Sequence, residues 1–380
     1  MNATPRAEAL IDLEAIRDNV RLLRARVGGR SVMAVVKADG YGHGILQSAA
    51  AARAGGADWL GVAVIEEALE LRAAGDTGPI LSWLASPGED YRLALKADVE
   101  VSAYSVAQLS EILAAARDSG QLARVQLKVD SGLSRGGARP DEWPALVHAA
   151  RRAELGGRVE VTGIWSHFAC SDEPEHPSVA RQESVFRAAL DIAAEAGLQP
   201  QVRHLANSAA VLTRESAWFD MVRVGLAGYG LSPIPQLAGP AELGLRPAMT
   251  VRAQVALTKR LAAGDGVAYG HTYIVENDTE IALIPVGYGD GIPRHASNRA
   301  PVWVDGRRYQ IAGRVSMDQF VVATGDDQIK PGQTAILFGT GDEGVPTAHD
   351  WAEAADTIAY EIVTRIGGRI PRRYVGSLTR

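Results

Sequence analysis

A lysine near the start of the chain stands directly after a short apolar run and is followed closely by glycines. The stretch reads VMAVVKADGYGHG, from Val32 to Gly44, and the lysine is Lys37. An amine that is partly removed from water at a strand end has a lowered pKa, and it can form a Schiff base with a carbonyl group. A single lysine after a strand is more often a solvated side chain, so its interpretation depends on the residues that accompany it.

Polar residues also stand at the ends of other apolar runs. Each has a simple structural interpretation when taken alone, such as a core histidine or an arginine at the rim of a sheet. Their repetition at five strand ends favours a shared site, because the carboxyl ends of the strands carry the active site in a barrel. Besides Lys37 they are Lys128 and Arg135 in KVDSGLSRGG, His167 in IWSHF, Asn207 and Ser208 in HLANSAA, and Arg223 and Gly225 in VRVGLAGYG.

The elements that position these residues alternate between short apolar strands and amphipathic helices from Leu13 to about Pro235. One helix is SVAQLSEILAAARDSG, with Ser105 as its N-cap and Gly120 at its end. Buried strands separated by helices predict a parallel sheet, and eight such units suit a (β/α)8 TIM-type barrel. A doubly wound open sheet is the alternative. The expected strands are Val32–Val36, Trp59–Val64, Pro79–Leu84, Val99–Ala103, Val125–Val129, Val159–Trp165, Gln201–Leu205 and Met221–Val224.

A second, mainly β domain is expected after SPIPQLAGP, where the helical pattern stops. Turn signals separate its strands, including the Asp305–Gly306 pair of a hairpin. One helix, HDWAEAADTIAYEIVTRIG, is predicted with Asp350 as N-cap and Glu353 three residues later. The early run EALIDL could pair with this domain or begin the barrel. The β-rich segments are MTVRAQVALTKRL, TEIALIPVGYG, APVWVDGRRYQIAG and TAILFG.

The groups around the lysine suit an aromatic phosphate cofactor. Ser208 opens a predicted helix, and the loop through Gly225 and Leu226 follows Arg223, so both places offer backbone N–H groups to an anion. The hydroxyl of Tyr41 could donate to the same phosphate. These parts fit pyridoxal 5'-phosphate (PLP), which binds lysine and accepts electrons. A nucleotide-binding glycine loop is a weaker interpretation, because GYGHG does not match G-x-G-x-x-G.

Composition excludes several other classes of protein. The chain has 380 residues and a formal net charge of −6, which gives no basic surface for nucleic acid or anionic membranes. Its single cysteine, Cys170, allows neither an internal disulfide nor a thiolate metal cluster, which fits a reducing compartment. We find no signal-peptide pattern and no apolar window of transmembrane length, so we expect a cytoplasmic protein.

The motifs, taken in order, closely resemble those of bacterial alanine racemases. The matching segments are AVVKADGYGHG, KVDSGLSRGG, HLANSAA, VRVGLAGYGLSP, GVAYGHTY, VGYGDG and GRVSMDQ, and they span essentially the whole chain. The resemblance implies a fold-type III PLP enzyme that is a homodimer with sites at the subunit interface. It also implies an amino-terminal strand in residues 1–13 that packs with the β domain, a PLP-binding barrel in 14–236, and the β domain in 237–380.

The same resemblance implies two bases on opposite faces of the substrate carbon. Lys37 would take the proton from D-alanine, and Tyr269 of the partner subunit would take it from L-alanine. Tyr269 would contact His167, with Arg223 behind the histidine and also facing the pyridine nitrogen of PLP. Asn207, Ser208, Gly225 and Leu226 would join Tyr41 around the cofactor.

Further residues take roles from the resemblance. Arg135 and the backbone N–H of Met317 would bind the substrate carboxylate, and Tyr288 would narrow the entrance. Lys128 could be carbamylated, which would give an anion beside Arg135. The sequence departs from some relatives at Gly368, where they carry a phosphate-binding tyrosine, and whether Tyr374 replaces it is left open.

The expected reaction is the interconversion of L- and D-alanine, which would supply D-alanine for peptidoglycan. A racemase with a wider substrate range, acting on serine or basic amino acids, is the alternative on the same scaffold. A decarboxylase of this fold type is disfavoured, because it needs a carboxylate near the pyridine nitrogen where Arg223 is expected. A PLP-carrying homeostasis protein without catalysis would lack the second domain.

Overall fold

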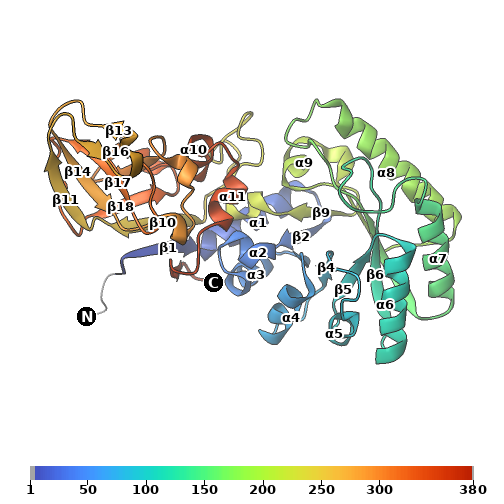
Figure 1. Ribbon diagram of the computed structural model, residues 1–380. Coiled ribbons are helices and arrows are strands. Elements are labelled where there is room, and N and C mark those ends of the chain that lie inside the picture. Colours follow the sequence, from blue (N-terminus) through green and yellow to red (C-terminus); the bar gives the residue numbers. More distant parts are fainter. Residues whose placement is uncertain (1–4, 379–380) are drawn as a thin grey trace.

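The computed structural model describes residues 5–378, which form a helix-covered barrel and a second unit built mainly of strands (Figure 1). The barrel comprises the blue to yellow part of the chain, and the second unit the orange and red part together with the first strand. Helices α1 and α11 lie between the two units in this view.

Eight parallel strands form the barrel in the order β8-β7-β6-β5-β4-β3-β2-β9. The two outermost strands of this order are joined by backbone hydrogen bonds from Asp220 N–H to the Arg203 carbonyl (3.1 Å) and from Arg223 N–H to the Ala206 carbonyl (3.0 Å). This closure confirms the predicted TIM-type barrel and rules out an open doubly wound sheet. The strands are β2 Ser31–Val35, β3 Trp59–Val62, β4 Ile80–Ser82, β5 Glu100–Ala103, β6 Ala123–Lys128, β7 Val159–Trp165, β8 Val202–His204 and β9 Met221–Val224.

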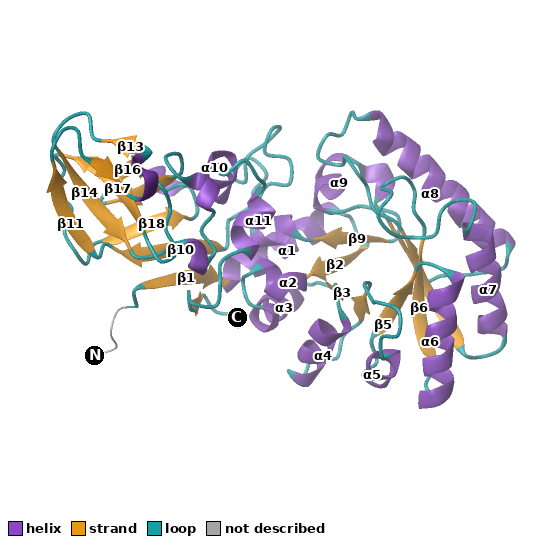
Figure 2. Ribbon diagram, in the orientation of Figure 1, coloured by secondary structure: helices purple, strands orange, loops and turns teal. Residues whose placement is uncertain are grey.

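Helices cover the outside of the barrel and turn their apolar faces toward the strands (Figure 2). Helix α6 begins as the sequence predicts, because the Ser105 hydroxyl accepts the N–H of Gln108 (3.2 Å), and it ends at Gly120 with φ of 68°. The helices are α1 Leu13–Arg26, α3 Ile45–Ala54, α4 Ile65–Ala73, α5 Tyr91–Lys96, α6 Val106–Ser119, α7 Trp143–Leu155, α8 Pro177–Glu195 and α9 Ser208–Thr213.

The second unit contains three sheets, and its largest has the strand order β16-β15-β18-β10-β1-β19. Strand β1 comes first in the sequence, yet it pairs antiparallel with β10 and parallel with β19. The other two sheets are β11-β14-β17 and β12-β13. The strands are β1 Ala7–Asp12, β10 Met249–Gln254, β11 Leu257–Leu261, β12 Gly266–Val267, β13 Tyr273–Ile274, β14 Thr279–Ile284, β15 Pro301–Val304, β16 Arg307–Gln310, β17 Phe320–Gly325, β18 Thr334–Phe338 and β19 Arg372–Val375.

The predicted hairpin of this unit is confirmed, whereas the predicted single helix is wrong. Asp305 and Gly306 both have positive φ, 49° and 86°, and join β15 to β16 as expected. The single helix predicted from HDWAEAADTIAYEIVTRIG is wrong, because the chain breaks at Asp356 (φ 53°) into α10, Ala348–Ala354, and α11, Ala359–Thr364.

The predicted N-cap of that helix is also wrong. Thr347 is the N-cap of α10, and its hydroxyl accepts the N–H of Asp350 (3.1 Å), while the Asp350 carboxylate accepts the N–H of Thr347 (2.9 Å). Asp350 therefore occupies the third position of a reciprocal capping box, the place that an acidic side chain takes when a threonine already caps the helix.

Two large apolar cores are present, and one of them crosses from the second unit into the barrel. It contains strand residues such as Val251 and Phe338 together with Val35, Tyr41 and Tyr229 of the barrel. Tyr41, in the segment that follows β2, is thus buried in a core shared by both units. No helix within the described part of the chain is both long and apolar enough to cross a membrane.

Candidate active site

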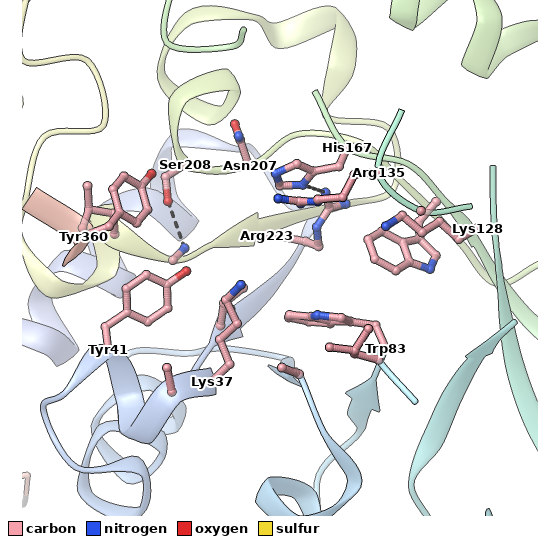
Figure 3. Close-up of a pocket in the computed structure, with 18 of the residues that line it drawn as sticks. Lys37, Tyr41, Trp83, Lys128, Arg135, His167, Asn207, Ser208, Arg223 and Tyr360 are labelled. Carbon is pink, nitrogen blue, oxygen red and sulfur yellow. Dashed lines mark hydrogen bonds between the residues drawn. The ribbon is translucent and has the colours of Figure 1, made fainter. Parts of the chain in front are cut away.

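A cavity of about 610 Å³ opens at the carboxyl ends of the barrel strands. Four cationic side chains line it, and none of the lining residues in the described chain is aspartate or glutamate. Such a pocket is suited to an anionic ligand. Figure 3 shows most of the lining residues, which are Val35, Lys37, Ala38, Tyr41, Ala63, Trp83, Leu84, Tyr104, Lys128, Arg135, Gly136, Trp165, His167, Asn207, Ser208, Arg223, Gly225, Leu226, Tyr360 and Thr364.

Lys37 is the first residue of a left-handed helical turn. The segment labelled α2, Lys37–Tyr41, has φ values of 53°, 54°, 60° and 54° at its last four residues, so it is a left-handed helical turn. Its N–H groups of Gly40 and Gly42 donate to the carbonyls of Val36 (2.9 Å) and Ala38 (3.0 Å). Because three of the four residues are not glycine, the turn stores roughly 1–2 kcal/mol of strain for each of them.

Two glycines allow the second unit to pack closely against the segment that follows this turn. A Cβ atom on Gly42 would collide with the carbonyl of Val363 in α11, and one on Gly44 would collide with the hydroxyl of Tyr374. Both glycines also have positive φ, 78° and 94°. The bare backbone beside Lys37 is therefore required by the close packing of the second unit as well as by the hand of the turn.

Hydrogen bonds from neighbouring elements hold the strained turn. The Glu67 carboxylate accepts the N–H groups of Ala38 (2.6 Å) and Ala63 (2.9 Å), and the Asp39 carboxylate accepts the N–H of Ile45 (2.9 Å). Glu67 of α4 thus fixes the start of the turn, and Asp39 ties the turn to the start of α3.

His43 supports the same turn from inside the protein. Its ring is fully buried, stacks on Tyr229 with centroids 4.5 Å apart, and places Nδ1 2.9 Å from the Tyr41 carbonyl. A carbonyl only accepts hydrogen bonds, so Nδ1 carries the proton and the ring is neutral. Burial lowers the pKa of His43 to about 4. Its Nε2 has no hydrogen-bond partner within residues 5–378.

The amine of Lys37 points into the cavity (Figure 3). It lies 5.7 Å from the centre of the Trp83 ring. Burial lowers the pKa of Lys37, and the positive charge of Arg135 lowers it further, while Glu67 opposes the shift. The uncharged, nucleophilic form of this amine is therefore easier to reach than in an exposed lysine.

Hydroxyl and backbone donors gather at one end of the cavity. Ser208 begins α9, and its Oγ accepts the N–H of Gly225 (2.9 Å). A Cβ atom on Gly225 would lie 2.5 Å from the Tyr41 hydroxyl, so glycine lets that hydroxyl approach the backbone. Asn207 caps α9 by accepting the N–H of Ala210 (3.1 Å). This end of the cavity is the part best suited to a phosphate.

Tyr360 was missed by the sequence analysis. It projects from α11 of the second unit into the same end of the cavity, with its ring centre 6.1 Å from that of Tyr41. Burial raises its pKa to about 12. In the sequence it resembles an ordinary buried aromatic of an apolar helix, so only the packing of α11 on the barrel reveals it. Tyr374 does not line the cavity, because its hydroxyl lies behind the turn against Gly44.

Arg223 joins two histidines beneath the cavity. Its guanidinium donates to Nδ1 of His167 and to Nδ1 of His204, both at 3.0 Å, and to the carbonyl of Ser166 at 2.8 Å. Burial lowers the pKa of Arg223 to about 9, so it stays charged at neutral pH. Burial and the nearby positive charges lower the pKa of His167 well below its usual value. His167 is thus neutral and carries its proton on Nε2.

Lys128 is the most crowded of the cations. Its Nζ lies 4.4 Å from the centre of the Trp165 ring and 4.8 Å from that of Tyr104. Burial lowers the pKa of Lys128 to about 8, with further contributions from Arg223 and Arg135. Aromatic faces compensate part of the charge.

Three predicted site residues lie outside this cavity in the single chain. Tyr269, Met317 and Tyr288 belong to the second unit and are 70%, 55% and 40% exposed. The N–H of Tyr288 donates to the Ser316 carbonyl (3.0 Å), so Tyr288 and Met317 stand on adjacent segments. Tyr269 follows Ala268, whose φ of 56° is strained for a residue with a side chain. The chain thus presents these three side chains to solvent.

Comparison with known proteins identifies the family. The family models described as "Alanine racemase, N-terminal domain" and "Alanine racemase, C-terminal domain" match residues 11–233 and 248–374. An alanine racemase of Thermobifida fusca is 56% identical over 372 residues, which cover 98% of this chain and 99% of that relative. The chain belongs to the alanine racemase family.

Solved structures of alanine racemases share the whole architecture. The crystal structure of the enzyme from D-cycloserine-producing Streptomyces lavendulae has a TM-score of 0.97 and 55% identity, and covers 98% of both chains. The Bacillus anthracis alanine racemase with bound L-Ala-P has a TM-score of 0.90 and 33% identity, and covers 100% of this chain and 97% of its own. The fold of this alanine racemase family member is therefore shared across both of its units.

The buried His43 predicts a pH dependence of stability. The unfolded chain binds a proton on this ring below pH ~6.5, whereas the folded chain resists it down to a pKa of about 4. The unfolded state thus binds more protons in this window, and stability falls as the pH falls through it, by roughly 3 kcal/mol in all. We expect the free energy of unfolding of the wild type to decrease from pH 6.5 to 4.5 more steeply than that of His43→Gln, as measured by urea titration.

His148→Gln is the matched control, because His148 is exposed on α7 and its ring is in water in both states. This variant should follow the wild-type curve. Parallel curves for the wild type and His43→Gln would show that His43 does not resist protonation in the fold.

Proposed function

We propose that this protein interconverts L-alanine and D-alanine, using PLP held on Lys37 and working as a homodimer. The observation that carries the proposal is a partly desolvated lysine in a cavity whose lining has four cations and no acidic side chain. PLP and an amino acid bring a phosphate, a phenolic oxygen and a carboxylate, which are the anions that such a lining would balance.

The residues of the cavity fit PLP at both ends. The hydroxyls of Tyr41, Ser208 and Tyr360 and the N–H of Leu226 would hold the phosphate. Gly225 would orient the Ser208 hydroxyl through its N–H, and Asn207 caps the helix that carries Ser208. Lys37 would hold the carbonyl carbon. When bound, PLP supplies an electron sink for the α-carbon of an amino acid.

Arg223 would face the pyridine nitrogen of the cofactor. A guanidinium only donates hydrogen bonds and keeps its protons, so it leaves that nitrogen without a proton of its own. PLP held in this way would supply a weaker electron sink, which would favour return of the proton to the substrate carbon. This property suits racemisation and argues against decarboxylation on the same scaffold.

Two bases would act on opposite faces of the α-carbon. Lys37 takes the proton from D-alanine, and Tyr269 of a second copy of the chain takes it from L-alanine. A phenol titrates near pH ~10 and needs a donor to stabilise its anion. The Nε2–H of His167 can be that donor, because its Nδ1 is engaged by Arg223. Arg223 and His167 would thus stabilise the phenolate of Tyr269 by a hydrogen bond and a nearby positive charge, without transferring a proton to it.

The second copy would complete the site from its β domain. Tyr269, Met317 and Tyr288 are exposed in one chain, which is what a role in another subunit's site requires. The N–H of Met317 and the guanidinium of Arg135 would bind the substrate carboxylate from two sides. Tyr288, which stands beside Met317, would narrow the entrance and favour a methyl side chain over larger ones, which is the basis for preferring alanine to serine or basic amino acids.

Lys128 would be carbamylated in the active enzyme. With a pKa of about 8, roughly a tenth of the amine is uncharged near pH 7, far more than in an ordinary lysine, and can react with carbon dioxide. The resulting anion would replace a cation beside Arg135 and Arg223, so a repulsion becomes an attraction that orients Arg135. We further propose a cytoplasmic enzyme that supplies D-alanine for peptidoglycan.

The cofactor assignment is tested by the spectrum of the purified protein with added PLP. We expect a visible absorbance band and alanine racemisation, and borohydride should fix the cofactor to the peptide that contains Lys37. Lys37→Ala should lose the band and the activity, because no other amine replaces it at that position. Lys96→Ala, at the exposed end of α5, is the control and should behave as the wild type. A wild type that shows no band with excess PLP would refute the proposal.

The carbamate on Lys128 is tested by carbon-13 NMR in labelled bicarbonate. We expect a carbamate resonance in the wild type near neutral pH and in the control Lys96→Met. It should vanish in Lys128→Met, and racemase activity should drop about tenfold through a higher KM, because Arg135 loses the anion that orients it. A wild-type spectrum without that resonance, in protein that racemises alanine, would show that Lys128 acts as the free amine.

A further inference from the structure

A chain of hydrogen bonds runs through the barrel interior beneath Arg223. Arg223 Nη1 donates to His204 Nδ1 (3.0 Å), His204 Nε2 lies 2.7 Å from Gln126 Oε1, and Gln126 Nε2 donates to Glu100 Oε2 (2.9 Å). All four side chains are buried, and they come from β9, β8, β6 and β5. The chain connects the cavity to the first residue of β5, at the opposite end of the strands.

The direction of every hydrogen bond in this chain is fixed by its first member. Arginine only donates, so Nδ1 of His204 accepts and its Nε2 carries the proton. That Nε2–H needs an acceptor, which turns the Gln126 carbonyl oxygen toward it and the Gln126 amide toward Glu100. Glu100 is the terminal acceptor, as a carboxylate must be. The donors all point away from the cavity toward one buried negative charge.

Other contacts show that Glu100 is held as that terminal acceptor. Thr162 Oγ1 donates to Oε2 of Glu100 (2.7 Å), and Arg124 Nε donates to Oε1 (3.2 Å). Burial raises the pKa of Glu100, while these hydrogen bonds and the charge of Arg124 oppose the shift. The carboxylate is therefore stabilised by donors on both oxygens.

Packing fixes the orientation of the two middle members. The His204 ring lies parallel to that of Trp165, at 2° and 5.7 Å between centroids, and the Trp165 indole N–H donates to Ser102 Oγ (2.8 Å). A Cβ atom on Gly163 would lie 2.7 Å from Oε1 of Gln126, so the amide needs a glycine on the neighbouring strand. His204 and Gln126 thus have little freedom to reorient.

We propose that Glu100, Gln126 and His204 are positioning residues that hold the Arg223 guanidinium toward the cofactor and give it a buried counter-charge at a distance. Arg223 has no carboxylate among its hydrogen-bond partners in the described structure, which are histidine rings and carbonyls. Polarised hydrogen bonds in a medium of low dielectric carry part of the Glu100 charge to it. The inference rests on the proposed function, in which Arg223 faces the pyridine nitrogen.

Two variants and one control separate this role from simple stability. Glu100→Gln keeps the shape and removes the charge, and Gln126→Leu interrupts the chain. Thr162→Val removes another buried hydrogen bond to the same Glu100 oxygen but leaves the chain intact. Unfolding midpoints establish that the variants are folded, and Glu100→Gln alone suffices if Gln126→Leu does not fold.

The first measurement uses the protein without cofactor. The Nε2–H proton resonance of His204, in histidine-labelled protein, should lie downfield in the wild type because of its bond to Gln126. It should move upfield in Gln126→Leu and, less, in Glu100→Gln, and stay in place in Thr162→Val. An equal displacement in all three variants would mean that these changes loosen the barrel without acting through a directed chain.

The second measurement is PLP affinity by absorbance titration. We expect about tenfold weaker binding in Glu100→Gln and Gln126→Leu, the size of one weakened charge-assisted hydrogen bond, and wild-type affinity within about twofold in Thr162→Val. Unchanged affinity in Glu100→Gln, or an equal loss in Thr162→Val, would overturn the proposal. A wild type that does not bind PLP would refute the proposed function instead, while the His204 resonance would still decide whether the chain of hydrogen bonds is directed as described.

Discussion

The structure depends on keeping several positive charges at the mouth of the barrel, in a cavity whose described lining contains no aspartate or glutamate. Lys37, Lys128, Arg135 and Arg223 share one cavity, and the burial that brings them together lowers the pKa of both lysines and of Arg223. Isolated buried charges are costly unless they are hydrogen-bonded or balanced. The protein meets this constraint in part with carbonyl oxygens, histidine acceptors and aromatic faces, and the positive charge that remains is what an anionic ligand would balance.

A second constraint links the two units of the chain at the left-handed turn after β2. The turn is strained, and it persists because α4, the buried ring of His43 and the packing of α11 on Gly42 all hold it. Its two ends carry Lys37 and Tyr41, whose side chains both point into the cavity (Figure 3). Tyr360 completes that end from the second unit, so the units must be packed together for the cavity to form.

The sequence predicts the barrel well because its strands are short apolar runs with clear ends. Val159–Trp165 and Met221–Val224 are observed with the predicted limits, and the polar residues after the strands converge as the barrel geometry requires. One miss is local, because Thr347 stands three residues before Asp350 and caps the helix itself. The other follows from tertiary packing, because Tyr360 resembles a core aromatic until α11 is placed. Local sequence does not show the left-handed turn at Lys37 either, since Ala38 and Tyr41 belong to residue types that disfavour positive φ.

The central claim is that one active site needs side chains from two copies of the chain, and hybrid dimers test it most directly. Differently tagged Lys37→Ala and Tyr269→Phe chains would be co-expressed, and the dimers that carry both tags would be purified. One of the two sites in such a dimer contains both intact residues, so the account predicts about half of the wild-type racemase activity from two nearly inactive parents. Hybrid dimers no more active than either parent would show that Lys37 and Tyr269 do not meet across a subunit interface.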